Sequence, residues 1–157
     1  MPQKVKAIPD GYHSVTPYLF IKGATRALDF YKQVFGAVER MRMPGPNNTI
    51  GHAEITINGS IVMLADEAPS MNALSAETIG GTPVMIHVYV EDVDAVVNRA
   101  AAAGAKIVQP VEDKFYGDRS GSIIDPFGHL WGVATHKEDL TPEEMQKRMA
   151  ALQKKPT

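Results

Sequence analysis

The pattern of hydrophobic and polar positions changes its period along the chain and predicts short strands alternating with helices. From Ala24 to Phe35, apolar residues recur at steps of three and four, which is typical of one face of an amphipathic helix that Gly36 ends. The dipeptide Asn58-Gly59 favours a two-residue hairpin turn, because both residues tolerate a positive φ. Short runs rich in β-branched and aromatic residues predict the strands of this half at 15–21, 38–43, 50–57 and 60–65.

The same order of elements is predicted a second time. A strand at 84–90 precedes an alanine-rich helix at 92–103, which Asp92 caps with its carboxylate and Gly104 ends. Three more strands follow this helix. They are expected at 106–111, 119–124 and 130–136.

The spacing between equivalent positions indicates an internal repeat. The separation between Tyr18 and His87, on the first strand of each half, equals the separation between the glycines of the two final hairpins. The helix-ending glycines Gly36 and Gly104 are slightly closer together, which we interpret as a one-residue slip in a connection. The sequence therefore predicts two tandem βαβββ modules.

The domain boundaries follow from this repeat. We expect one domain over residues 12–137, with modules at about 14–66 and 83–136. A helical extension over 138–157 is expected to follow, since Thr141-Pro142-Glu143-Glu144 has the pattern of a capping box. Its apolar stripe predicts packing on the domain or on a partner subunit.

Composition and charge narrow the function classes. The chain of 157 residues has no cysteine, which excludes disulfides, thiolate zinc sites and cysteine nucleophiles. Its formal net charge of −2 argues against nucleic-acid binding. No apolar run has the length of a signal peptide or a membrane-spanning helix. We therefore expect a cytoplasmic protein that does not associate with membranes.

Four stretches carry a resemblance to a known family. They are PYLFIKGATRALDFYKQVFGA (17–37), HAEITINGSIVMLADE (52–67), HVYVEDVDAVVNRAAAAGA (87–105) and GDRSGSIIDPFGHLWGVATH (117–136). In this order they resemble the glyoxalase/bleomycin-resistance superfamily, also called vicinal oxygen chelate proteins, and within it the PhnB-like branch. The resemblance implies an α+β fold in which the two modules form a cup-shaped mixed sheet around a ligand cavity, often within a homodimer.

The resemblance also identifies where metal-dependent members hold their ion. The corresponding positions, on the first and last strand of each module, are Tyr18, Met63, His87 and Gly132. Only His87 is a good ligand for a divalent metal, so we do not expect a metal at the usual site. A displaced site built from His87, His52 and Glu54 stays open as an alternative, and it would take a divalent metal.

Strand alternation predicts which side chains line the cup. Trp131 is expected in the core, and Asp125 in a structural turn rather than in catalysis. Arg119 could bind a carboxylate or phosphate, or form an ion pair with Glu54, and Glu54 with His52 could serve in acid–base chemistry. The residues predicted to face inward are Tyr18, Phe20, His52, Glu54, Met63, His87, Tyr89 and Arg119, a mostly aromatic set typical of small-molecule pockets.

Three functions fit these observations. The leading hypothesis is a cytoplasmic homodimer that binds a small organic ligand in an aromatic-lined cup. The alternative is a metal-dependent lyase, isomerase or dioxygenase of the same superfamily. A third is a non-catalytic interaction protein, which would show a collapsed cup and an exposed apolar patch around the C-terminal helix.

Overall fold

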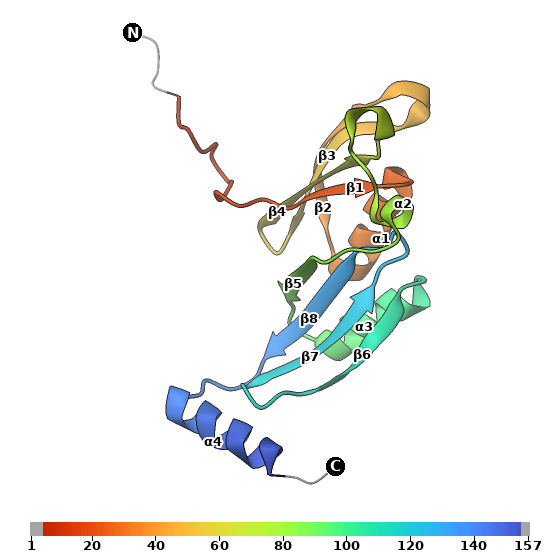
Figure 1. Cartoon of the computed structure of the whole chain (residues 1–157). Coiled ribbons are helices and arrows are strands. Elements are labelled where there is room, and N and C mark those ends of the chain that lie inside the picture. Colours follow the sequence, from red (N-terminus) through yellow and green to blue (C-terminus); the bar gives the residue numbers. More distant parts are fainter. Residues whose placement is uncertain (1–4, 155–157) are drawn as a thin grey trace. The chain divides into compact units, whose positions relative to one another are not determined.

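The computed structural model describes residues 5–154 of the chain. The chain divides into two compact units, a first unit that ends at Gly81 and a second unit that begins at Thr82 (Figure 1). Each unit contains a four-stranded mixed sheet with a helix against it, so the predicted pair of βαβββ modules is confirmed.

The first unit has the strand order β1-β4-β3-β2, in which β1 runs parallel to β4 and the other pairs are antiparallel. The first strand begins at Tyr18 rather than at Val15, whose side chain is 86% exposed. The other strands and the helix agree with the sequence prediction to within one residue. The elements are β1 (Tyr18–Ile21), α1 (Ala24–Phe35), β2 (Val38–Pro44), β3 (Ile50–Ile57) and β4 (Ser60–Asp66), with a 3-10 turn η1 (Pro46–Asn48) between β2 and β3.

The core of the first unit lies between α1 and the sheet. The predicted apolar face of α1 is buried, and it includes Leu28 and Tyr31. Asp66 at the end of β4 accepts hydrogen bonds of 3.0 Å from the backbone N–H groups of Gly23 and Ala24, which satisfies the exposed start of the helix. These contacts fix α1 against one face of the sheet, and we call the opposite face the open face.

The second unit repeats this arrangement with the strand order β5-β8-β7-β6. Asp92 caps α3 as predicted, its carboxylate accepting a hydrogen bond of 3.0 Å from the Ala95 N–H. The linking segment contains η2 (Pro69–Met71) and α2 (Ala76–Ile79) of the first unit. The elements of the second unit are β5 (Met85–Tyr89), α3 (Val93–Ala102), β6 (Lys106–Asp113), β7 (Asp118–Ile124), β8 (Leu130–His136) and α4 (Pro142–Gln153).

Trp131 and Asp125 have the structural roles that the sequence predicts. Trp131 is 1% exposed, and its indole N–H donates a hydrogen bond of 2.9 Å to the Asp125 carboxylate. The same carboxylate accepts from the backbone N–H groups of Phe127 and His129, both at 2.9 Å. Asp125 therefore organises the turn between β7 and β8 and anchors the largest side chain of the core.

The prediction that Arg119 faces inward is wrong. In the first sheet Met63 pairs with Glu54. If the two halves differed by a constant number of residues, Gly132, the equivalent of Met63, would pair with the equivalent of Glu54. It pairs instead with Ser122, which comes one residue earlier in the chain. The second hairpin turn therefore contains an extra residue, and this residue reverses the predicted faces of β7, so that Arg119 faces α3.

Arg119 serves as a structural ion-pair partner. Its guanidinium donates to both carboxylate oxygens of Asp94 on α3, at 2.7 and 2.9 Å, and to Asp113 on β6 at 3.3 Å. Asp94 and then Asp113 raise the pKa of Arg119, and Arg119 in turn holds the pKa of Asp94 below its usual range. The Arg119 side chain thus joins α3 to the sheet.

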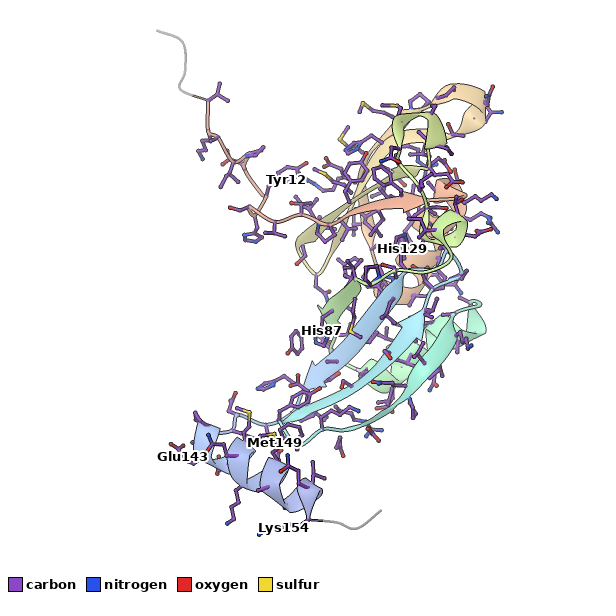
Figure 2. The ribbon with its side chains drawn as sticks, in the orientation of Figure 1. Tyr12, His87, His129, Glu143, Met149 and Lys154 are labelled. Atoms are coloured by element: carbon purple, nitrogen blue, oxygen red, sulfur yellow. The ribbon has the colours of Figure 1, made fainter. Side chains whose placement is uncertain are left out.

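The C-terminal helix α4 begins with the predicted capping box, in which Thr141 and Glu144 bond each other's backbone N–H groups. None of its residues is buried, and Met149 is 44% exposed. Figure 2 labels Glu143 and Met149 on this helix. Arg148 joins the helix to the rest of the second unit, because its guanidinium donates to the Glu138 carboxylate at 2.6 Å and to the Phe115 carbonyl at 3.5 Å. Within residues 5–154, no helix has the length and apolar character needed to cross a membrane.

Candidate functional site

The open face of the first sheet carries five of the predicted inward residues. The buried residues Leu19 and Ile21 face α1, so the residues that alternate with them on β1 lie on the open face. Pairing between strands brings Met63 next to both Tyr18 and Glu54. The predicted residues that share this face are Tyr18, Phe20, His52, Glu54 and Met63.

Glu54 lies at the centre of a cluster of polar side chains on this face. Its side chain is 7% exposed and accepts from three donors. One carboxylate oxygen accepts from the Tyr12 hydroxyl and from Arg40 at 3.3 Å, and the other is 3.1 Å from Nε2 of His52. Burial raises the pKa of Glu54, but the bonds from Tyr12 and His52 outweigh it and hold this pKa below its usual range. Glu54 is therefore a fixed anionic acceptor.

Tyr18 extends this cluster through His52. The Tyr18 hydroxyl lies 2.8 Å from Nδ1 of His52, whose other ring nitrogen contacts Glu54. Burial, together with the Glu54 charge, raises the pKa of Tyr18. The Tyr18 ring also lies 5.2 Å from the ring of Phe20. The arrangement is a Tyr–His–Glu chain in which a carboxylate orients an imidazole, and the imidazole contacts a neutral phenol.

Tyr12 belongs to the cluster although no sequence pattern predicts it. It precedes β1 in a segment without regular strand or helix structure, and its hydroxyl donates to Glu54. The Arg40 guanidinium carbon lies 5.1 Å from the centre of the Tyr12 ring, within cation–π distance. The hydrogen bond to Glu54 raises the pKa of Tyr12. Only the three-dimensional structure brings Tyr12 to this carboxylate.

Arg40 reaches Glu54 because β2 is irregular. The pairing of β2 with β3 steps from Glu39 and Ile55 to Met41 and Glu54, so Arg40 is the extra residue of a β-bulge. The second sheet has a matching irregularity at the equivalent place in β6. Comparison of the halves therefore reveals a paired bulge, although the sequence alone does not predict it. The ion pair predicted between Glu54 and Arg119 is replaced by one between Glu54 and Arg40.

A cavity of about 420 Å³ adjoins this cluster. Its volume is within the range of small-molecule sites. Met63 of β4 forms one wall, and the segment before β1 forms the rest. The lining residues are Ala7, Ile8, Pro9, Tyr12, His13, Ser14, Thr16 and Met63.

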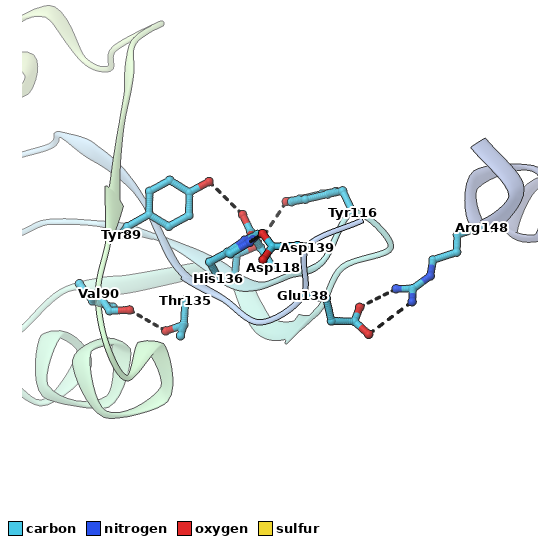
Figure 3. A network of polar contacts seen from close by, with 10 residues as sticks. Tyr89, Val90, Tyr116, Asp118, Thr135, His136, Glu138, Asp139 and Arg148 are labelled. Carbon is cyan, nitrogen blue, oxygen red and sulfur yellow. Dashed lines mark hydrogen bonds and ion pairs between the residues drawn. The ribbon is translucent and has the colours of Figure 1, made fainter. Parts of the chain in front are cut away.

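The corresponding face of the second sheet holds His87 and Tyr89, as predicted. Tyr89 is 55% exposed, and its hydroxyl donates a hydrogen bond of 3.0 Å to Asp118 (Figure 3). Asp118 also lies 2.7 Å from Nδ1 of His136, whose Nε2 is 2.9 Å from Asp139. Asp139 and Asp118 raise the pKa of His136, and Asp118 raises that of Tyr89. This second network joins β5, β7, β8 and the segment that leads to α4.

The residues at the family's metal positions do not fit a metal. Tyr18 pairs with Met63 and His87 with Gly132, as the repeat predicts, but methionine and glycine offer no hard or borderline ligand. A Cβ atom added at Gly132 would lie 2.8 Å from Nδ1 of His87, so the missing side chain leaves room for that imidazole. Within residues 5–154, no three His, Asp or Glu side chains are grouped as metal ligands.

Comparisons with known proteins agree with the fold. The family model of the Glyoxalase/Bleomycin resistance protein/Dioxygenase superfamily matches residues 12–133. The uncharacterized protein Mb0911c of Mycobacterium bovis is 42% identical over 141 residues, which cover 88% of this chain and 93% of that protein.

Solved structures also show the same fold. The crystal structure of TioX from Micromonospora sp. ML1 is similar with a TM-score of 0.62 and 32% identity, over 82% of this chain and all of TioX. The At5g48480 product of Arabidopsis thaliana has a TM-score of 0.63 and 27% identity, over 78% of this chain and 98% of its own. A PhnB protein from Bacillus cereus, at 21% identity and a TM-score of 0.62 over 78% of this chain and 99% of its own, shares the fold.

Proposed function

The chain belongs to the glyoxalase/bleomycin resistance protein/dioxygenase superfamily, and we propose that its first unit binds a small organic ligand beside Met63. The observation that carries this proposal is the cavity of about 420 Å³ next to the open face. Met63, Ile8 and Pro9 offer apolar contact there, and Tyr12 joins the cavity to the Glu54 cluster through its hydroxyl. Such a combination is typical of ligand pockets, in which a few polar groups orient a mainly apolar molecule.

Only some of the other residues predicted to face inward belong to the proposed site. Tyr18, Phe20 and Met63 supply apolar and aromatic surface in the first unit. His87 and Tyr89 belong to the second unit, where their rings contact each other, and they are not part of the site beside Met63. Arg119 is left out, because Asp94 and Asp113 occupy its guanidinium. We keep the homodimer, which the family resemblance implies, and the cytoplasmic location, which the sequence favours, as part of the proposal.

Methionine methyl groups offer a direct test. The chain has eight methionines, and Met63 is the one that lines the cavity. We expect indole or 2-naphthol to shift the ¹³C-methyl NMR resonance of Met63 and to leave that of Met149 on α4 unchanged. A Ser14→Phe variant, which fills the cavity, is expected to abolish the shift, whereas Ser70→Phe at an exposed position is not. Unchanged Met63 resonances throughout a broad screen would contradict the proposal.

A second candidate function is proton transfer on the bound ligand. The Tyr18–His52–Glu54 chain favours it, because a carboxylate that orients an imidazole is a common arrangement for acid–base catalysis. In this function the Tyr18 hydroxyl takes the proton from the ligand and passes its own proton to Nδ1 of His52, while Glu54 holds the imidazole ring in place. No step in it requires a metal ion.

Hydrogen exchange tests the second candidate. A ligand with an acidic C–H bond, once found by the methyl screen, is expected to take up deuterium from D₂O in the presence of the protein. The His52→Gln variant should bind that ligand and exchange it no faster than buffer alone. Equal exchange by both proteins would remove His52 from the reaction and leave binding as the function.

A further inference from the structure

The side chain of Tyr12 makes the hydrogen bond between the segment before β1 and the first sheet. We call residues 5–16 the strap. Much of it is exposed, including Val5 at 90% and Val15 at 86%. Within residues 5–154, the hydrogen bond from the Tyr12 hydroxyl to Glu54 is the one that joins the strap to the rest of the chain. The other bonds of the strap, such as Lys6 to Asp10, stay within it.

Tyr12 stands between the cavity and the Glu54 carboxylate. Tyr12 lines the cavity and its hydroxyl donates to Glu54, whereas Glu54 is not among the lining residues. Met63, the other wall, is the strand neighbour of Glu54 on the same face. Removal of the Tyr12 ring would therefore extend the cavity to a buried carboxylate and to the guanidinium of Arg40.

We propose that Tyr12 occupies part of the ligand site, and that the ligand is a neutral aromatic molecule whose hydroxyl group replaces the Tyr12 phenol at Glu54. The inference rests on the proposed function and names its ligand class. The strap is then an internal competitor that leaves the sheet when such a molecule binds. Figure 2 labels Tyr12 on this segment, where the chain leads into β1.

The chemistry of the contacts defines this class. A buried carboxylate that loses its donor is costly to leave unpaired, so the replacing molecule must itself donate a hydrogen bond. The guanidinium 5.1 Å from the Tyr12 ring centre favours a planar aromatic ring in the same place. A carboxylate ligand would face the charge of Glu54 and is disfavoured.

The first experiment removes the competitor. In a Tyr12→Ala variant, 4-methylphenol has the shape and donor of the deleted side chain, and 4-methylanisole has the shape without the donor. We expect the variant to bind 4-methylphenol about tenfold or more tightly than 4-methylanisole, measured by titration of the Met63 methyl resonance. Wild-type protein should bind 4-methylphenol more weakly than the variant does. Equal affinities of the variant for the two compounds would overturn the inference.

The second experiment follows the strap in the wild-type chain. Chymotrypsin can cleave after Tyr12 only when the strap is free, so 4-methylphenol is expected to speed this cleavage and 4-methylanisole is not. Tyr12→Phe, which keeps the ring but removes the donor, should free the strap without any ligand, as measured by chymotrypsin cleavage after residue 12. Cleavage after Leu152 on α4, which is 52% exposed, serves as the control and should not change. Unchanged strap cleavage with saturating 4-methylphenol would overturn the inference.

The two proposals fail in different ways. If aromatic compounds shift the Met63 resonance whether or not they carry a donor, and Tyr12→Ala changes nothing, the ligand class is wrong and the binding function stands. If no compound shifts that resonance in the wild type or in Tyr12→Ala, the binding function itself is wrong. Dispersed methyl resonances in both proteins confirm that each is folded in this comparison.

Discussion

Replacement of Glu54 by glutamine tests the cluster that organises the open face. The glutamine oxygen can still accept from Tyr12 and Arg40, and His52 can accept from the amide nitrogen if its ring proton moves to Nδ1. The change therefore converts charge-assisted bonds into neutral ones. The Tyr18 hydroxyl then accepts from Nδ1 of His52, and its own hydrogen can bond to solvent because Tyr18 is 41% exposed. A loss of about 2 kcal/mol follows, reduced in part because the neutral amide is easier to bury.

This loss should depend on pH in a defined direction. The folded-state pKa of Glu54 lies below the ordinary value of 4.5. A carboxyl group with a lowered pKa stabilises the folded state above its unfolded pKa, and this stability is lost as the pH falls through the folded value. The difference between wild type and Glu54→Gln should thus be constant from about pH 7 to pH 5.5 and shrink below about pH 4.5.

Urea and thermal unfolding followed by circular dichroism measure both effects. At pH 7 we expect Glu54→Gln to lower the melting temperature by about 4–8 °C. Glu112→Gln is the matched control, because Glu112 pairs with Lys114 at an exposed position and should change stability little. A Glu54→Gln protein as stable as the wild type at pH 7, or a difference that does not begin to shrink as the pH falls below about 4.5, would refute this account of the cluster.

Three further predictions concern other parts of the chain. Arg119→Gln should lower thermal stability, because Asp94 on α3 loses its partner, yet leave ligand shifts at Met63 unchanged; weaker binding would contradict the assigned role. NMR titration of His136 should give a pKa above 6.5 that falls in Asp139→Asn, so its ion pairs stabilise the fold at low pH and are lost as the pH rises. An unshifted His136 would contradict that geometry. Elemental mass spectrometry should find well under one Ni, Zn, Mn or Fe per chain. One metal ion per chain that is lost in His87→Ala would contradict the conclusion that the residues at the family's metal positions do not fit a metal.

Much of the fold could be predicted because local patterns and tertiary packing agree. The bounds of α1 and β3 are those that periodicity predicts, and Asn58-Gly59 forms the turn between β3 and β4 with both residues at positive φ. Trp131 is in the core, as strand alternation predicts. In these elements the hydrophobic period alone determines which face is buried.

The site could be predicted only where strand alternation holds. Tyr18, His52 and Glu54 share a face because β1 and β3 are regular. For Arg119 alternation predicts the wrong face, since one extra residue in a turn reverses every side chain of the strand. Arg40 reaches Glu54 through a bulge, which no local pattern in β2 predicts.

Tyr12 shows a second limit of prediction from sequence patterns. It lies in the strap, where no hydrophobic period exists to orient a side chain, and its partner is 42 residues away in sequence. Contacts of this kind follow from the path of the chain over the finished sheet. The most informative residue for the ligand site is therefore one that sequence patterns do not identify.

The binding site beside Met63 is the central claim, and intermolecular nuclear Overhauser effects test it most directly. With any aromatic compound that binds the wild-type protein, we predict effects between the ligand protons and the Met63 methyl group. Effects confined to Met85 or Met149, which belong to the second unit, would contradict the claim and move the ligand site elsewhere.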